Sequence, residues 1–125
     1  MNIADAFAGI AIGISRAFDG PYHDSIARWL GVPVLDDGGS IVTPGVPVGL
    51  PCMVQVDAVT EGMRAEAGFA EKDVALLVLV ATLAAPLDTD ATVEVSAGPS
   101  AGSYSVQSVG LDPMGSHYVC RGRRA

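Results

Sequence analysis

Charged residues are scarce in this sequence. They make up 17% of its 125 residues, whereas hydrophobic residues make up 50%. Soluble domains usually carry about a quarter of charged residues, so we expect part of the apolar surface to be covered by a protein partner. Basic residues are the scarcest: 7 Lys and Arg stand against 14 Asp and Glu, for a formal net charge of −7. This charge disfavours tight binding of nucleic acid or of an anionic membrane.

Side chains suited to bond chemistry are equally few. Cys52 and Cys120 have the spacing of neither a metal site nor a redox motif, and we interpret them as small buried residues rather than as a disulfide. His23 and His117 are too far apart in sequence to form an i, i+4 metal pair. The sequence therefore predicts no catalytic residue, no metal site, no cofactor and no enzymatic activity.

No apolar run is long enough to span a bilayer. The longest N-terminal run, residues 6–15, has about ten residues, where a membrane helix needs about twenty. Asp5 precedes it, where a signal peptide would carry Lys or Arg. We therefore expect no targeting segment and synthesis in the cytoplasm.

Residues 2–18 have the apolar spacing of a helix. The large apolar residues recur every three or four positions: Ile3, Phe7, Ile10, Ile14 and Phe18. Gly9 and Gly13 lie four apart and would form a smooth strip on which another backbone can approach. Two alternatives stay open: a helix that caps its own domain, or an arm (residues 1–20) that docks on a neighbouring subunit. For the arm, deletion of residues 1–18 is expected to leave a folded monomer that does not assemble.

The rest of the chain, residues 21–125, has the pattern of short strands separated by Gly and Pro. Extended segments are expected at residues 22–35, 40–43, 52–59, 73–81 and 92–96, with a turn at 36–39 and a short helix at 60–64. Residues 44–51 hold three prolines and two glycines and are expected to form either a loop or a strand edge that does not pair in a ladder. Residues 73–81 are apolar throughout and predict a strand buried on both faces. The predicted fold is mainly β: a small barrel or sandwich with an N-terminal helix and one short inserted helix.

The clearest signal is a hairpin over residues 103–121. Tyr104, Val106 and, one step out of phase, Val109 alternate with polar residues, and residues 112–115 supply a turn. Tyr118 and Cys120 then resume the alternation. A chain whose clearest feature is a hairpin is expected to act through shape and contacts.

A few residues are candidates for partner contacts. Arg121, Arg123 and Arg124 form a basic tail, which is either a solvated end or a dock for an acidic partner. Trp29, the single tryptophan, belongs to the core, to the barrel rim or to a partner anchor. The predicted interface residues are Ile3, Phe7, Ile10, Ile14, Trp29, Arg121, Arg123 and Arg124.

One segment has a remote catalytic alternative. Residues 87–91 are similar to the Asp-Thr-Gly-Ala motif of retroviral-type aspartic proteases, in which two subunits each supply one Asp. Here Asp88 would be that Asp, but Asp90 replaces the glycine and would add like-charge repulsion. The alternative without catalysis is that residues 87–91 form a polar turn between strands.

The order of these elements resembles the lambda-type head–tail joining, or stopper, proteins of tailed phages and gene-transfer agents. The residues that carry the resemblance are Gly102, Tyr104, Val106, Val109, Asp112, Gly115, His117, Tyr118 and Arg121, with residues 55–57, 68–69 and 73–74. The resemblance implies a structural virion protein without catalytic residues. It would form a homo-oligomeric ring, usually a hexamer, between portal or adaptor and tail, with DNA passing through. The apolar N-terminus and residues 44–51 depart from that family and leave the connector layer open: stopper, adaptor or tail terminator.

Overall fold

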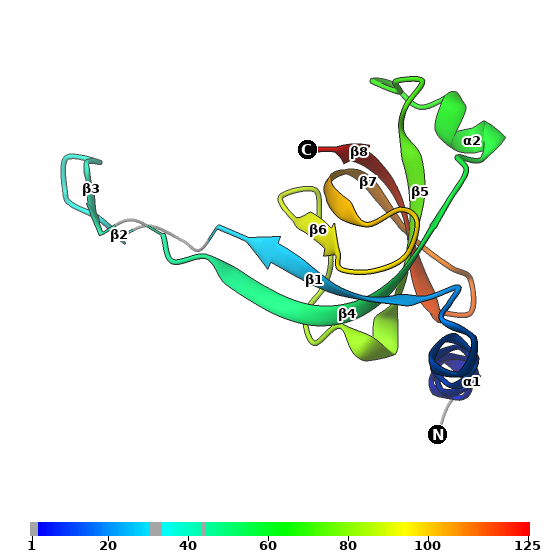
Figure 1. Cartoon of the computed structure of the whole chain (residues 1–125). Helices are drawn as coiled ribbons and strands as arrows, with labels where there is room; N and C mark the ends of the chain where they lie inside the picture. Colours follow the sequence, from blue (N-terminus) through cyan, green and yellow to red (C-terminus); the bar gives the residue numbers. More distant parts are fainter. Residues whose placement is uncertain (1–2, 31–33, 44) are drawn as a thin grey trace.

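The computed structural model describes residues 3–30, 34–43 and 45–125. Six antiparallel strands close into a barrel in the order β1-β4-β5-β8-β7-β6 (Figure 1). Their bounds are β1 His23–Trp29, β4 Val48–Asp57, β5 Val74–Leu79, β6 Thr92–Val95, β7 Gly102–Leu111 and β8 His117–Arg124. The remaining elements are α1 Ile3–Phe18, β2 Val34–Leu35, β3 Ile41–Thr43, α2 Glu61–Arg64 and the 3-10 turn η1 Val80–Thr82. The predicted fold class is confirmed.

The barrel is filled by inward-facing residues from all six of its strands. Strand β5 contributes Leu76 and Val78, which are fully buried, and β8 contributes Cys120. On the outer side of β5, Leu79 is also fully buried, because it packs in a second cluster with Ala11 of α1. The predicted burial of this strand on both faces is confirmed, and the N-terminal helix covers its outer face at Leu79.

Helix α1 caps its own barrel through its small residues. Ala8, Ala11 and Ser15 are its buried positions, and the second cluster adds Tyr22 and Met53. The Ser15 hydroxyl accepts a hydrogen bond from the Tyr22 backbone N–H at 2.9 Å, which fixes the helix end to the start of β1. The helix is therefore not a detached arm, and only its exposed sides are available to a partner.

The closing hairpin is the predicted one, and its irregularity has a structural cause. Strands β7 and β8 pair over most of their length, but the register shifts between Val106 and Ser108. Because the bulge adds one residue to β7, the side chains after it point to the opposite face of the sheet from the one that strict alternation would give. Val109 therefore packs against the core although it is out of phase with Tyr104 and Val106.

Strands β2 and β3 form a separate hairpin between β1 and β4, which projects away from the barrel (Figure 1). Its turn is fixed by Asp36, whose Oδ1 accepts hydrogen bonds from the backbone N–H groups of Gly38 and Ser40, both at 2.9 Å. We call residues 34–43 and 45–47 the finger; residues 31–33 and 44 lie outside the described residues.

Of the two alternatives for residues 44–51, the loop is wrong for the second half, where the chain forms a strand with one unpaired edge. Strand β4 begins at Val48, and Pro51 pairs with Ile26 of β1. The reason is that β5 pairs with β4 only from Val54 onward. Pro51 thus lies where one strand edge needs no ladder hydrogen bond, a position that proline tolerates. Residues 1 and 2 of the expected helix also lie outside the described residues.

Candidate interaction surface

The outer face of α1 carries a stripe of exposed large apolar side chains. The stripe consists of Ile3, Phe7, Ile10, Ile14 and Phe18, with exposed fractions from 40% for Phe7 to 80% for Phe18. Their spacing of three or four positions places these five residues on one side of the helix, about a quarter turn from the side on which Ala8, Ala11 and Ser15 face the barrel. Four of the eight predicted interface residues therefore lie together on one exposed face.

A shallow hollow runs beside this stripe. It has a volume of about 290 Å³ and a largely apolar lining from α1 (Phe7, Ile10, Ala11 and Ile14), from the turn before β1 (Pro21 and Tyr22) and from Gln55 of β4. Gly9 and Gly13 are exposed on the helix, and a Cβ at either position would meet no atom within 4 Å. The helix thus offers a groove and a smooth strip that another chain can approach closely.

Trp29 lies at the rim of the barrel, at the end of β1. Its ring is half-buried against the core, and its Nε1–H donates to Asp88 Oδ1 at 3.0 Å. The same carboxylate oxygen accepts from the Asp90 backbone N–H, also at 3.0 Å. In this chain Asp88 therefore closes a turn and holds the tryptophan, which is the structural interpretation of the protease-like segment.

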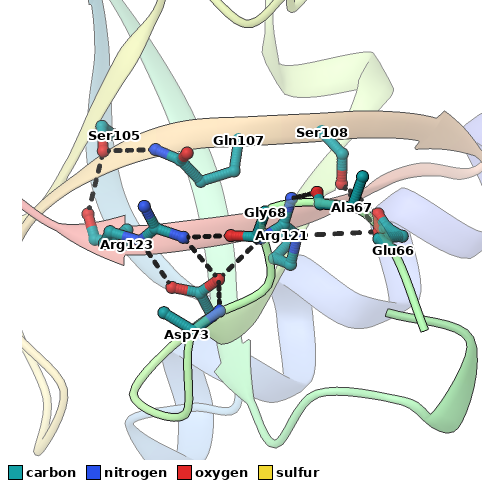
Figure 2. A network of polar contacts seen from close by, with 10 residues as sticks. Glu66, Ala67, Gly68, Asp73, Ser105, Gln107, Ser108, Arg121 and Arg123 are labelled. Carbon is teal, nitrogen blue, oxygen red and sulfur yellow. Dashed lines mark hydrogen bonds and ion pairs between the residues drawn. The ribbon is translucent and has the colours of Figure 1, made fainter. Parts of the chain in front are cut away.

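Arg121 is buried, so its predicted exposure in a basic tail is wrong. Its side chain is 5% exposed, and Nη1 donates to Asp73 Oδ2 at 2.7 Å. Nη2 donates to the Ala67 carbonyl at 3.2 Å, and Nε faces the Glu66 carboxylate at 3.6 Å (Figure 2). The acidic partner of Arg121 therefore lies within the same chain.

Arg123 completes this network from the same face of β8. Its Nε donates to Asp73 Oδ1 at 2.8 Å, and its Nη2 donates to the Gly68 carbonyl at 2.7 Å. The hydrogen bonds from Arg123, from the Ala70 backbone N–H and from Arg121 lower the pKa of the Asp73 carboxyl well below its ordinary range, against the opposing effect of burial. The network joins the loop after α2 to the end of β8.

Arg124 also has partners within the chain. Its Nη1 donates to the Ala101 carbonyl at 3.1 Å, and its guanidinium lies 5.1 Å from the centre of the Tyr104 ring. The three arginines thus belong to strand β8 or its end and hold neighbouring loops. The predicted basic tail is wrong as a unit, because β8 extends to Arg124.

The sequence interpretation missed Asp73 and Glu66 as partners of these arginines. The signal is present once the topology is known: Val74 pairs with Gly122, so the register continues to place Asp73 opposite Arg123. Glu66 also accepts a hydrogen bond from the Ser108 hydroxyl of β7 at 2.7 Å, which ties it to a second strand. No local spacing in the sequence reveals these contacts, since the partners are 48 and 50 residues apart.

The cysteines and His117, which the sequence offered as candidates for bond or metal chemistry, are engaged in packing or hydrogen bonding. Cys52 and Cys120 are free thiols in the barrel core, where burial raises their pKa values to about 11 and about 12. The His117 ring lies 6.1 Å from that of Phe7, and its Nδ1 is 2.8 Å from the Ser116 hydroxyl. Within the described part of the chain, no group of three His, Cys, Asp or Glu residues could hold a metal ion. None of the described helices is long and apolar enough to cross a membrane.

Comparison with known proteins supports the fold alone. No protein-family model matches the chain, and no curated protein gives a significant match. Among solved structures, the chain is similar to protein SF1141 from Shigella flexneri 2a, a structural genomics target, with a TM-score of 0.57 and 17% sequence identity. The similarity covers 85% of this chain and 95% of that one.

Proposed function

We propose that this protein is a structural virion protein that forms a ring in the head–tail connector of a tailed phage or gene-transfer agent. The ring joins the portal or its adaptor to the tail and surrounds the DNA passage. The stopper layer is our first choice, and the adaptor and tail-terminator layers of the same neck are the alternatives. The observation that carries the proposal is the exposed apolar stripe of α1 on a barrel that is already closed.

The stripe is as large as the largest apolar patch of a typical soluble monomer. At roughly 150 to 200 Å² per fully exposed large apolar side chain, its five residues leave on the order of 500 Å² of apolar surface in contact with water. The largest patch on a typical monomer is of the same order and is commonly functional. The strands of the closed barrel pair mainly with one another, and side-chain surfaces such as this one are then the means of assembly.

Charge is consistent with a passage for DNA. The net charge is −7, and the buried network already uses Arg121 and Arg123 to neutralise Asp73. A ring of such subunits presents excess negative charge to its surroundings, and this charge repels DNA phosphates. DNA then slides past the subunits without being held, and the protein needs no base-reading residues.

The proposal is tested in particles. Inactivation of the gene, in the phage or gene-transfer agent that carries it, should yield DNA-filled heads and separate tails in negative-stain electron microscopy. Complementation with the wild-type chain should restore joined particles, and antibody against the protein should label the neck. Joined particles of normal yield without the gene would contradict the proposal, as would antibody labelling of the capsid or the tail tip alone.

The structure favours a point substitution over the deletion of residues 1–18. Removal of α1 would expose Leu79 and Met53 of the second cluster, so lost assembly could result from lost folding. Ile10→Asp changes an exposed side chain and should leave the thermal midpoint within about 3 °C of wild type while joined particles fall at least tenfold. Ala58→Asp, at an exposed position outside the stripe, is the control with the same added charge and should retain joining.

A further inference from the structure

Among the described residues, two groups of exposed large apolar side chains lie near opposite ends of strand β1. The first is the α1 stripe with its groove. The second group lies on the finger and on the residues that adjoin it at the ends of β1 and β4. It consists of Leu30, Leu35, Val46 and Val48, with exposed fractions from 45% to 76%. Helix α1 comes directly before β1 and the finger directly after it, so β1 separates the two surfaces (Figure 1).

The finger needs a surface to pack on. It has two short paired strands, β2 and β3, and none of its described residues belongs to either hydrophobic cluster. A two-stranded hairpin without such packing is marginally stable in water at best. Its exposed leucine and valine side chains indicate that the packing surface belongs to another molecule.

We propose that the finger of one subunit lies along the α1 stripe and groove of the next subunit of the same protein. This inference rests on the proposed ring and names the contact that builds it. Because the two mating surfaces differ, the contact is heterologous: each subunit offers its finger on one side and its helix on the other. Repetition of such a contact closes a ring when the rotation per subunit permits it.

The areas of the two surfaces match this assignment. The finger and its adjoining residues leave on the order of 400 Å² of apolar surface exposed and the stripe on the order of 500 Å². Their sum approaches the roughly 1,000 Å² that a specific interface buries at minimum. Charge does not oppose the contact, because the stripe residues are uncharged and the finger's charged residues, Asp36 and Asp37, lie at its turn. A single contact of this kind covers both surfaces, whereas a contact between two stripes would leave the finger residues exposed.

Cross-linking between cysteine variants tests the contact. Ile10→Cys places a thiol on the stripe and Leu35→Cys places one on the finger, both at exposed positions. The two proteins, one with a size tag, are mixed and treated with a short bis-maleimide. The expected product is a mixed dimer on a denaturing gel, while either variant alone gives at least tenfold less dimer. Cys52 and Cys120 stay unreacted because they are buried, which the wild-type chain verifies.

Lys72→Cys is the matched control, because Lys72 is exposed and belongs to neither surface. Mixed with Leu35→Cys, it should give no dimer above background. Dimers of Ile10→Cys with itself would overturn the inference in favour of a symmetric helix–helix contact. Absence of the mixed dimer would also overturn it. If analytical ultracentrifugation of the wild-type protein then shows a ring, the proposed function stands and the subunits use another contact. If it shows a monomer, the gene-inactivation experiment on particles tests the proposed function separately.

Discussion

Arg121 and Asp73 form an ion pair inside the protein, with 2.7 Å between Nη1 and Oδ2 and side-chain exposures of 5% and 0%. Asp73 comes directly before β5, and Arg121 lies on the neighbouring strand β8. Taking both charges out of water is costly, and the cost is offset only when further hydrogen bonds satisfy the pair. Arg123 and the Ala70 backbone N–H provide them.

Substitution of Asp73 by Asn should therefore be strongly destabilising. It leaves the buried Arg121 guanidinium with only the more distant and partly exposed Glu66 carboxylate, at 3.6 Å, as counter-charge. We therefore expect a loss of about 2 to 4 kcal/mol in the free energy of unfolding. Urea denaturation followed by circular dichroism measures it. Glu71→Gln, an exposed neighbour in the same loop, should change the value by less than about 0.5 kcal/mol. Equal stabilities for the two variants would show that the ion pair makes no net contribution.

The same pair predicts a dependence of stability on pH. The folded state lowers the pKa of Asp73 from its ordinary value of 3.8, so the carboxylate stabilises the fold above that value. This contribution declines as the pH falls below 3.8 and is lost once the pH passes the lowered pKa of the folded state. The stability difference between wild type and Asp73→Asn should therefore shrink between about pH 5 and pH 2. A constant difference over that range would contradict the assignment.

Local pattern predicted the elements of this fold better than their partners. The alternation of Tyr104 and Val106 and the apolar run at residues 73–81 identified β7 and β5, because burial acts on each strand separately. The turn at residues 36–39 was predicted too. The separation of β2 and β3 from the barrel could not be predicted, because the pairing of strands is decided by contacts between residues distant in sequence.

For the candidate interaction surface, too, the part within one helix could be predicted and the contacts between distant segments could not. The α1 stripe was predictable, because its residues share one helix and its period of 3.6 alone places them on one face. The role of Arg121 was not predictable, because its exposure depends on Asp73 and Glu66, which only the barrel register brings to it. The connector function and the ring remain predictions, since the structural similarity concerns the fold.

Gly122 provides a test of core packing in the barrel. A Cβ at this position would lie 2.6 Å from Leu76 Cδ1 and 2.9 Å from its Cγ, in the fully buried interior. Gly122→Ala should therefore cost about 1 to 3 kcal/mol through overpacking. Gly110→Ala is the control on the adjacent strand, where the nearest atom, the Val119 carbonyl oxygen, is 3.5 Å from the added Cβ; it should cost less than Gly122→Ala.

The cause of that cost can be isolated with a second substitution. Leu76→Ala removes the side chain that the new methyl group would strike, at a cost of about 2 to 5 kcal/mol on its own. In this background Gly122→Ala should add little or even restore some stability, and a double-mutant cycle from urea denaturation measures the coupling. Additive costs would locate the problem in the backbone of β8 instead.

The pairing of Trp29 with Asp88 separates a structural turn from a catalytic acid. Asn keeps an Oδ1 that can accept from both the Trp29 indole and the Asp90 backbone N–H, so Asp88→Asn should change stability by less than about 0.5 kcal/mol. Asp88→Ala removes that acceptor and should cost about 1 kcal/mol, and the fluorescence of the single tryptophan should change in this variant only. If purified wild-type protein cleaved a peptide and Asp88→Asn abolished the cleavage at unchanged stability, the protease alternative would replace the structural one.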